Sequence, residues 1–167
     1  EYILIMDKKI KIALAQLNPL VGDVLGNMKK LITIRSKLDS DVDILVVPEL
    51  YISGYPIDDL VLREDFLSLV ESEIKKLVEI TKDGKSAIIF GAPRKDKTVI
   101  KNSVYVIEDG RIVAIRDKYE LPNTGVFDEQ RIFTEGNLES YVEIKKIKFG
   151  LPLSLIHISE PTRLRRI

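Results

Sequence analysis

Cysteine is absent from the 167 residues of this chain. The chain therefore cannot hold a disulfide framework, a zinc–thiolate site or a cysteine nucleophile of its own. Neither sign of charge is in excess, because 26 Lys and Arg residues balance 26 Asp and Glu residues. This balance argues against a nucleic acid or a membrane surface as a partner held by bulk electrostatics. No apolar run approaches the roughly 18 residues needed to cross a bilayer, so the cytoplasm is the expected location.

The residues that are present have the composition of an ordinary soluble globular protein. Apolar residues make up 45% and charged residues 31% of the chain. A chain of 167 residues is long enough for one domain with a hydrophobic core. One domain is therefore expected.

Apolar runs and helical periodicities alternate along the chain. Two amphipathic helices are predicted, one from a cap at Asp23 to about residue 39 and one over residues 60–82. The Asp109-Gly110 pair between two alternating runs predicts a hairpin over 99–116. The other predicted strands are 11–17, 44–47 stopped by Pro48, 87–90 stopped by Gly91-Ala92-Pro93, and 141–149.

The order of these elements indicates the fold class. Strands that alternate with helices are typical of a layered α/β sheet, and the hairpin adds antiparallel pairing, so the sheet should be mixed. Residues 118–140 are rich in turn formers and show no period. A loop of that length is unusual in a compact domain unless it has a function.

Glu49 directly follows a predicted buried strand and Pro48. Ligands and catalytic groups gather at the carboxyl ends of the strands in sheets of this kind. A carboxylate that is partly withdrawn from water at such a place is suited to proton transfer. The alternative is that Glu49 is a strand-end acid that only caps a turn.

Lys118 opens the long loop, where its ammonium group could stabilise negative charge that develops on a carbonyl oxygen. The alternative is a solvated lysine in a charged stretch. Tyr55-Pro56 after Gly54 indicates a tight turn that carries an aromatic ring, and residues 121–127 combine Pro, Asn and Gly. Both segments are also compatible with ordinary turn chemistry.

Five motifs follow one another along the chain at suitable spacing. They are Ile12-Ala13-Leu14-Ala15-Gln16-Leu17-Asn18-Pro19 with Val21-Gly22-Asp23; Pro48-Glu49-Leu50; Ser53-Gly54-Tyr55-Pro56 with Asp58-Asp59-Leu60; Gly91-Ala92-Pro93; and Asp117-Lys118 followed by Leu121-Pro122-Asn123 and Gly125-Val126-Phe127-Asp128-Glu129. In this order they resemble the nitrilase, or carbon–nitrogen hydrolase, superfamily. Within it they are most similar to the glutaminase domain of glutamine-dependent NAD⁺ synthetases. The resemblance covers residues 8–152, which are therefore predicted to be the N-terminal part of such a domain.

The resemblance implies a partial α-β-β-α sandwich and catalysis by a Glu–Lys–Cys triad. Glu49 would act as general base on the cysteine thiol, and Lys118 would help to stabilise the tetrahedral intermediate. The thiolate would attack the side-chain amide of glutamine, and ammonia would leave. Tyr55, Thr124 and Phe127 fall at positions that line the glutamine pocket, although many relatives carry tyrosine at the position of Thr124.

The resemblance also implies partners outside this chain. In the full-length family, ammonia passes to a C-terminal NAD⁺ synthetase domain that uses ATP and Mg to amidate deamido-NAD⁺. This chain itself is expected to hold no cofactor and no metal. The parent enzyme is expected to be a homo-oligomer, since sandwiches of this superfamily commonly pair through their helices.

The cysteine of the triad is missing. Relatives continue from a strand that ends in Gly into Ile-Cys-Glu-Asp, and here Ser154 stands at the expected place of the cysteine. From about residue 153 the chain no longer resembles the family, and the following segment looks like translated sequencing-adapter DNA. Residues 153–167 are therefore predicted to be an unrelated tail, and residues 1–7 an extension ahead of the domain. A natural basic tail is the alternative.

Three functions follow from these residues. The first is a glutaminase domain that is inactive because its nucleophile is absent. The second is a different nitrilase-type amidase, against which the motif Tyr55-Pro56-Ile57-Asp58-Asp59-Leu60 argues. The third is a non-catalytic binding module, which only the missing cysteine supports.

Overall fold

The computed structural model describes residues 9–123, 128–137 and 141–151. Helices and strands alternate in the first half of the chain, and strands dominate the second half. In chain order the elements are β1 (Ile12–Leu14), α1 (Val24–Ser36), β2 (Ile44–Val46), the 3-10 turn η1 (Asp58–Leu62), α2 (Glu64–Ile80), the turn η2 (Thr81–Asp83), β3 (Ala87–Asp96), β4 (Val99–Glu108), β5 (Arg111–Asp117), the turn η3 (Glu129–Arg131), β6 (Val142–Ile144) and β7 (Ile147–Phe149).

Strands β1 to β5 form one sheet in which the order in space is the order in the chain. The first three strands are parallel, with Ala13 beside Leu45 and Leu45 beside Ile88. Strands β3, β4 and β5 are antiparallel. The predicted mixed α/β sheet is therefore confirmed, although β1 occupies only three residues of the predicted strand 11–17.

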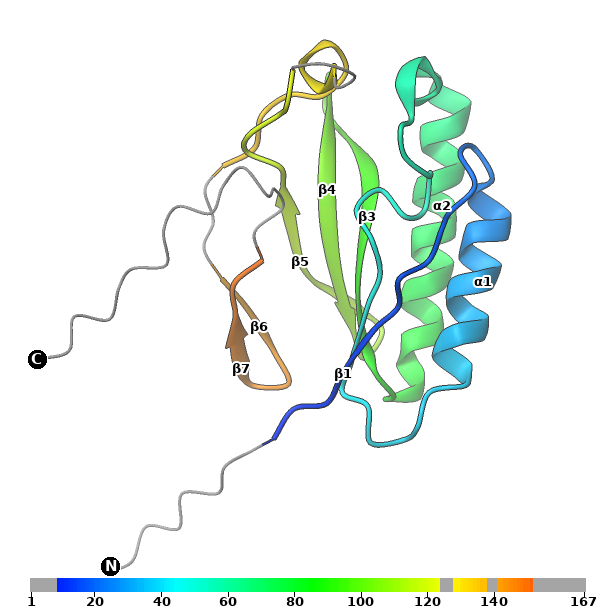
Figure 1. Ribbon diagram of the computed structural model, residues 1–167, viewed down its shortest axis with the longest axis vertical. Helices are drawn as coiled ribbons and strands as arrows, with labels where there is room; N and C mark the ends of the chain where they lie inside the picture. The colour runs from blue at the N-terminus through cyan, green and yellow to red at the C-terminus, as the bar shows by residue number, and fades with distance from the viewer. Residues whose placement is uncertain (1–8, 124–127, 138–140, 152–167) are drawn as a thin grey trace, which may run out of the picture.

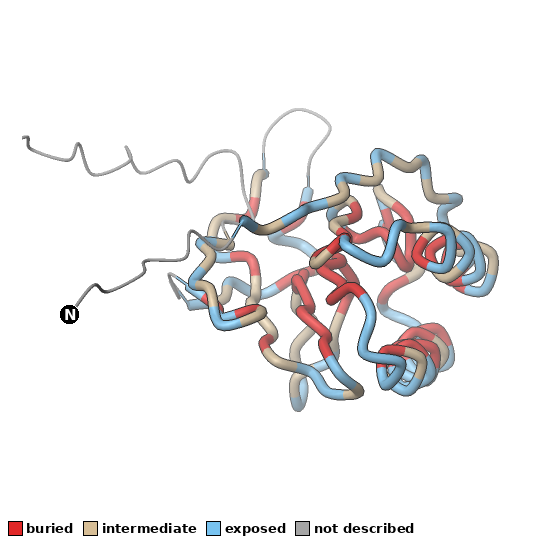
Figure 2. The backbone as a smooth tube through the Cα atoms, turned by 90° about the horizontal axis from the view of Figure 1, so that it is seen from below, coloured by how far each residue is buried: buried red, intermediate tan, exposed pale blue. Residues whose placement is uncertain are grey.

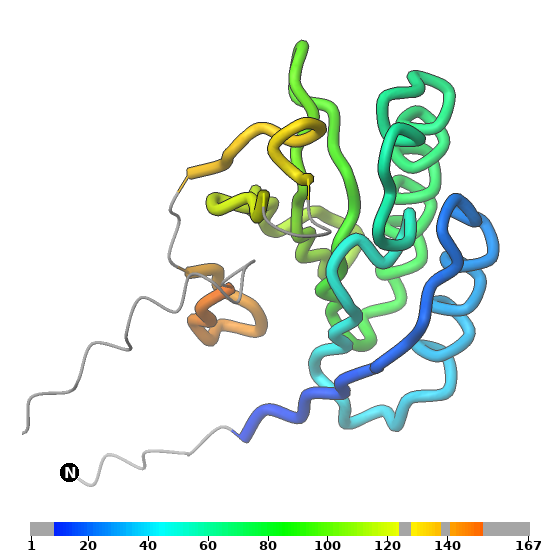
Figure 3. The backbone as a smooth tube through the Cα atoms, turned by 45° about the horizontal axis from the view of Figure 1, so that its top comes forward, coloured from blue at the N-terminus to red at the C-terminus, as the bar shows by residue number. Residues whose placement is uncertain are grey.

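Three layers of structure stack on one another (Figure 1). Helices α1 and α2 cover one face of the five-stranded sheet, and the β6–β7 hairpin lies on the other face (Figure 3). Successive residues of a strand point to opposite faces, so Ile88 belongs to the core under the helices and Ile89 to the smaller core under the hairpin. Figure 2 shows the buried residues on the sheet and on the inward sides of the helices. The described residues thus form an α-β-β arrangement, in agreement with the predicted partial α-β-β-α sandwich.

The two helices begin where local chemistry allows. The carboxylate of Asp23 accepts a hydrogen bond from Gly26 N at 2.9 Å, so the predicted cap of α1 is confirmed. Helix α1 ends at Ser36, before the predicted residue 39. Helix α2 begins at Glu64, because residues 58–62 form a separate 3-10 turn that the predicted helix 60–82 had included. Neither described helix combines the length and the apolar character needed to cross a membrane.

The predicted hairpin between β4 and β5 is confirmed. Asp109 and Gly110 form its turn with φ angles of 49° and 74°. Two consecutive left-handed residues match the right-handed twist of the flanking strands, and Asp-Gly is a favoured pair at these positions. The Asp-Gly signal therefore placed the turn correctly.

Strand β3 is longer than predicted, because it continues through Pro93 instead of stopping at Gly91. Pro93 pairs with Asn102 of β4, and the carbonyl oxygen of Asn102 accepts a hydrogen bond from Lys118 N on the β5 side. The nitrogen of Pro93 therefore faces away from β4, toward a side where β2 has already ended at Val46. A strand tolerates proline at such a position, because no ladder hydrogen bond is lost.

Residues 141–149 form two strands, so the prediction of one strand is wrong. In the hairpin β6–β7, Ile144 pairs with Ile147, and between them Lys145 and Lys146 have φ angles of 51° and 65°. Lysine gives no turn signal, which is why the hairpin was missed. The apolar alternation nevertheless moves from even to odd positions between Ile144 and Ile147, and that change of phase marks a two-residue turn.

Candidate active site

Glu49 follows β2 on a backbone that lies directly against β3. Ile52 N donates to Gly91 O at 3.2 Å, and Gly91 N donates to Pro48 O at 3.4 Å. A Cβ atom on Gly91 would lie 2.2 Å from Leu50 N and 2.8 Å from Glu49 Cα. Only glycine fits this close approach of two backbones, and the approach fixes where Glu49 emerges from the sheet.

Lys118 follows β5 and is held on both sides through its backbone. Its N–H donates to Asn102 O at 2.8 Å, and its carbonyl oxygen accepts from Gly136 N at 2.8 Å. A Cβ atom on Gly136 would lie 2.5 Å from Asp117 O, so the returning loop packs tightly on this segment. The strand end and the long loop together set the direction of the lysine side chain.

A second set of contacts, on the helix face of the sheet, secures the residue before Lys118. Asp117 accepts a hydrogen bond from Ser103 Oγ at 2.6 Å and one from Arg94 Nη2 at 2.7 Å. The three side chains come from β5, β4 and β3 and lie on one face. Burial of the guanidinium opposes its charged form, but the hydrogen bond and charge of Asp117, together with the charge of Asp96, outweigh burial, so the pKa of Arg94 is raised.

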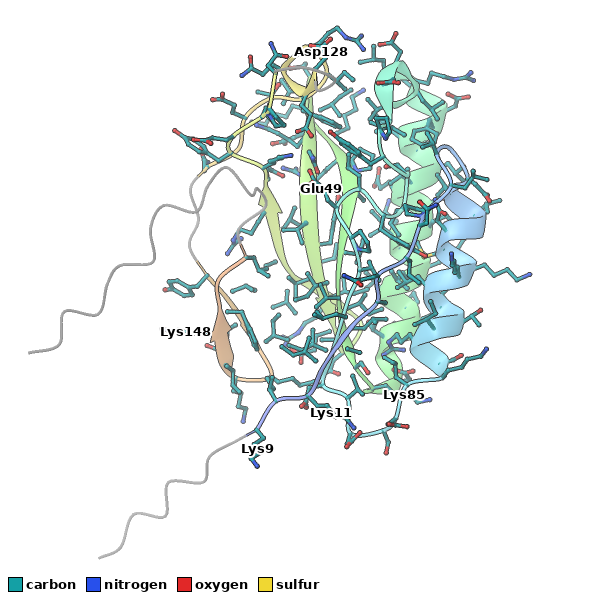
Figure 4. The ribbon with its side chains drawn as sticks, viewed as in Figure 1. Lys9, Lys11, Glu49, Lys85, Asp128 and Lys148 are labelled. Atoms are coloured by element: carbon teal, nitrogen blue, oxygen red, sulfur yellow. The ribbon has the colours of Figure 1, made fainter. Side chains whose placement is uncertain are left out.

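The side chains of Glu49 and Lys118 meet, as the sequence predicts for a shared site. Lys118 Nζ donates to Glu49 Oε1 at 2.8 Å and to Glu129 Oε1 at 3.0 Å, and it lies 3.0 Å from Glu129 Oε2. The side chains of Lys118 and Glu129 are each 5% exposed, whereas that of Glu49 is 37% exposed. Figure 4 shows Glu49 beside the upper parts of β3 and β4, below Asp128. One buried ammonium group is thus held between a buried carboxylate and an accessible one.

Two residues of this cluster, Glu129 and Asn102, were not predicted as site residues. Glu129 belongs to η3, and its backbone is held through Glu129 N to Pro122 O at 3.2 Å. Asn102 belongs to β4, and its Nδ2 donates to Glu49 Oε1 at 2.6 Å. An asparagine inside an otherwise buried strand was a signal, because a buried amide needs hydrogen-bond partners. Glu129 offered no comparable signal within a loop that has no period.

Tyr55 reaches the same cluster from the turn that follows Gly54. Its hydroxyl donates to Glu129 Oε1 at 3.0 Å. Burial, and then the negative charge of Glu129, raises the pKa of Tyr55 far above its ordinary value. Gly54 has a φ of 79°, and a Cβ there would lie 2.5 Å from Val21 Cα, so the turn depends on glycine. Tyr55 is therefore a neutral hydrogen-bond donor at physiological pH.

The remaining predicted site residues, Thr124, Phe127 and Ser154, lie outside the described residues. Of the six predicted positions, the structure brings together Glu49, Lys118 and Tyr55. Within residues 9–123, 128–137 and 141–151, no group of three His, Cys, Asp or Glu side chains is arranged to hold a metal ion. The chemistry available to the described cluster is that of a carboxylate with an exposed oxygen and an oriented ammonium group.

The sequence pattern of the carbon–nitrogen hydrolase family matches residues 11–153, which include every residue of this cluster. The chain belongs to the carbon–nitrogen hydrolase family. Among curated members, a glutamine-dependent NAD⁺ synthetase of Thermotoga maritima is 39% identical over 147 residues, which are 87% of this chain and 25% of that protein. One from Rhodobacter capsulatus is 33% identical over 149 residues, 89% of this chain and 27% of that protein.

Solved structures of the carbon–nitrogen hydrolase family agree with this placement. The glutamine-dependent NAD⁺ synthetase of Acinetobacter baumannii is 32% identical, with a TM-score of 0.79 over 86% of this chain and 27% of that chain. The NitN amidase of Neterenkonia sp. AN1 is 17% identical with a TM-score of 0.72, a likeness that concerns the fold alone. This carbon–nitrogen hydrolase chain spans about a quarter of the length of the curated relatives named above.

Proposed function

We propose that this chain is the N-terminal, amide-hydrolysing part of a glutamine-dependent NAD⁺ synthetase. The observation that carries the proposal is the contact of 2.8 Å between Lys118 Nζ and Glu49 Oε1, two side chains that are 69 residues apart in the sequence. Long stretches of NAD⁺ synthetases from several bacteria are similar to it in sequence. The alternative of a non-catalytic binding module leaves this partly buried contact without a purpose.

Each residue has a task in the proposed reaction. Glu49 removes the proton of the attacking thiol, and its partial exposure lets it reach a group outside the sheet. Lys118 stabilises the negative charge that develops on the amide oxygen of glutamine. Glu129 is buried against Lys118 and holds the ammonium group in place. Sulfur would bond to the amide carbon, the carbon–nitrogen bond would break, and the nitrogen would leave as ammonia after taking the proton back from Glu49. Water would then give a proton to Glu49 and cleave the thioester, releasing glutamate and the free thiol.

The chain carries no cysteine that could form that thioester. We expect it to bind glutamine without hydrolysing it, since Ser154 is a much weaker nucleophile at neutral pH. Tyr55, Thr124 and Phe127 are the residues proposed to line the glutamine pocket. Tyr55 fits that task because its side chain extends from the turn after Gly54 and its hydroxyl reaches the buried Glu129.

The proposed partner is the C-terminal NAD⁺ synthetase domain, which would receive the ammonia and use ATP and Mg. The parent enzyme is proposed to be a homo-oligomer in the cytoplasm. No step at Glu49 and Lys118 needs a cofactor. The ATP-dependent step is therefore assigned wholly to the remaining length of the parent protein.

The proposal is tested by titrating the full chain with glutamine in a calorimeter. We expect a dissociation constant below about 1 mM, the range in which enzymes commonly hold their substrates. Propionamide serves as the comparison, because a simple amidase would bind it as well as it binds glutamine. An ammonia assay on the same sample should stay at the level of buffer. Preference for propionamide, or measurable release of ammonia, would contradict the proposal.

Two variants make the binding experiment specific. Glu49→Gln keeps the shape of the side chain and removes its charge, and Lys118→Arg keeps the charge and changes the shape. We expect either variant to weaken glutamine binding by about tenfold or more, the effect of one lost charge-assisted hydrogen bond. Lys85→Gln, on the chain before β3, is the control and should bind as the parent chain does.

A further inference from the structure

Asn102 contacts both members of the Glu49–Lys118 pair. Its side-chain Nδ2 donates to Glu49 Oε1 at 2.6 Å, and its main-chain oxygen accepts from Lys118 N at 2.8 Å. The residue is 1% exposed and lies in β4, one of the two strands between β2, which precedes Glu49, and β5, which precedes Lys118. Any shift of Asn102 therefore moves the carboxylate and the lysine together.

The amide of Asn102 has only one favourable orientation. With Nδ2 toward Glu49, a donor faces a carboxylate, whereas a rotation by 180° would oppose two acceptors. In the observed orientation, Asn102 Oδ1 is buried and no described residue donates a hydrogen bond to it. An unmatched buried acceptor destabilises the folded state, because its hydrogen bonds to water are lost without replacement. A side chain retained at that cost is more consistent with a task at Glu49 than with stability alone.

The two oxygens of the Glu49 carboxylate differ in their surroundings. Oε1 accepts hydrogen bonds from Asn102 Nδ2 and Lys118 Nζ, at 2.6 and 2.8 Å. Within the described part of the chain, no residue donates to Oε2. Two donors on one oxygen fix the rotation of the carboxylate and occupy the lone pairs on that side. The other oxygen remains the basic one.

We propose that Asn102 is a positioning residue that, together with Lys118, anchors Glu49 Oε1 and leaves Oε2 to take the proton. This inference rests on the proposed function in so far as it names a proton acceptor. The anchoring itself concerns only residues of this chain. A carboxylate held on one side loses little freedom when it meets its substrate, which is the benefit of preorganisation.

The anchoring is tested by lysine labelling of the full chain. A succinimidyl ester acylates free amines, and mass spectrometry then reports the rate at Lys118 relative to that at the exposed Lys85. Lys118 should react slowly in the unmodified chain, because its side chain is 5% exposed and its ammonium group is hydrogen-bonded to two carboxylates. In Asn102→Ala and in Asn102→Leu, which is similar in size but has no hydrogen-bonding group, we expect the relative rate at Lys118 to rise by about tenfold or more.

Asn27→Ala is the matched control. Asn27 is also a buried asparagine, 3% exposed, and its side chain binds the backbone of Leu20 and Ile52 without touching Glu49 or Lys118. This variant should lose stability in urea to a similar degree and leave the rate at Lys118 unchanged. If Asn102→Leu and Asn27→Ala give equal rates at Lys118, Asn102 has only a structural role and the proposal is overturned. Asn102→Leu keeps the test valid even where Asn102→Ala does not fold.

The choice of oxygen has its own test, a crystal structure of the full chain with glutamine. We expect Oε2 of Glu49 to face the bound amide while Oε1 keeps Asn102 and Lys118. The reverse arrangement would refute the assignment. The two proposals can fail separately. If the unmodified chain does not bind glutamine but the Asn102 variants still raise the labelling rate at Lys118, the proposed function is disproved and the anchoring by Asn102 stands.

Discussion

The hydroxyl of Tyr55 donates a hydrogen bond to Glu129 Oε1 at 3.0 Å and so joins two segments that lie 74 residues apart. The same oxygen accepts from Lys118 Nζ at 3.0 Å. Tyr55, Glu129, Lys118 and Glu49 therefore form one continuous chain of hydrogen bonds. The turn after Gly54 and the loop that contains η3 depend on each other through this chain.

Replacing Tyr55 by Phe removes one donor from Glu129 and keeps the ring. We expect a loss of about 1 kcal/mol in the free energy of unfolding, the usual contribution of one hydrogen bond. Glutamine binding should weaken as well, because Glu129 and Lys118 then have more freedom. Urea unfolding and calorimetry measure the two effects. Tyr141→Phe is the control, since that residue is 56% exposed and its ring centroid lies 4.9 Å from Lys148 Nζ. Equal stability of Tyr55→Phe and the parent chain would show that the contact is not formed in solution.

Replacing Lys118 by Met leaves the carboxylates of Glu49 and Glu129 close together without a cation between them. Glu129 is the buried partner, 5% exposed. Removal of one partner from a buried ion pair costs about 3–5 kcal/mol. We expect a loss of that order in urea unfolding.

Glu129→Gln in the Lys118→Met background should recover part of the lost stability, because it removes one of the two opposed charges. A double variant no more stable than Lys118→Met alone would contradict the electrostatic explanation. The comparison thus separates charge from packing at the same two positions.

Replacing Gly91 by Ala introduces a methyl group 2.2 Å from Leu50 N. The backbone after β2 must then move away from β3, at a cost of about 1–3 kcal/mol or more. Because Glu49 is carried on that backbone, glutamine binding should be lost together with stability. Gly84→Ala is the comparison: it has open space around its Cβ position but a φ of 69°, so it should lose about 1 kcal/mol and keep its affinity for glutamine. Normal glutamine binding by Gly91→Ala would show that the close contact between Gly91 and the backbone at Glu49 and Leu50 does not position Glu49.

The ion pair between Arg35 and Asp83 predicts a dependence of stability on pH. Arg35 is 3% exposed on its side chain, and it holds both oxygens of Asp83 at 2.9 and 2.7 Å. The hydrogen bonds from Arg35 lower the pKa of Asp83 below its ordinary value of 3.8. A carboxyl group whose pKa is lowered by folding adds stability above its unfolded pKa, and this is lost as the pH falls through the folded pKa.

Asp83→Asn should therefore be less stable than the parent chain at neutral pH, and the difference should shrink below about pH 4. Urea unfolding over a series of pH values measures it. Asp109→Asn in the β4–β5 turn is the control, because the φ of 49° suits asparagine as well. A difference between Asp83→Asn and the parent chain that persists unchanged into acid would rule out the ion pair as its cause.

Local signals in the sequence predicted those parts of the fold that local chemistry determines. The cap at Asp23 and the Asp109-Gly110 turn were correct, because each depends on a few neighbouring residues. The extension of β3 through Pro93 was missed, because it depends on where β2 ends. The sequence of a strand does not show how far its neighbour reaches.

In the candidate site, too, some residues could be predicted from local sequence and others depend on contacts between distant segments. Glu49 and Lys118 were predicted through their motifs, and the structure places them in contact. Asn102 and Glu129 were not predicted as site residues. Asn102 meets Glu49 across 53 residues of sequence, and Glu129 meets Lys118 from a loop without a period. Contacts of that kind follow from the register of the sheet and the path of the loop.

The order of the strands in the large sheet also bears on how the protein is made. Since β1 to β5 lie side by side in the order of synthesis, each strand that leaves the ribosome can dock on an edge already formed. None of the strands β2 to β5 has to insert between two strands made before it, and each finds its first partner already synthesised. Glu49 and Lys118 belong to the early and the late side of that growing sheet. Their contact can thus form only after β5 has joined the four strands made before it.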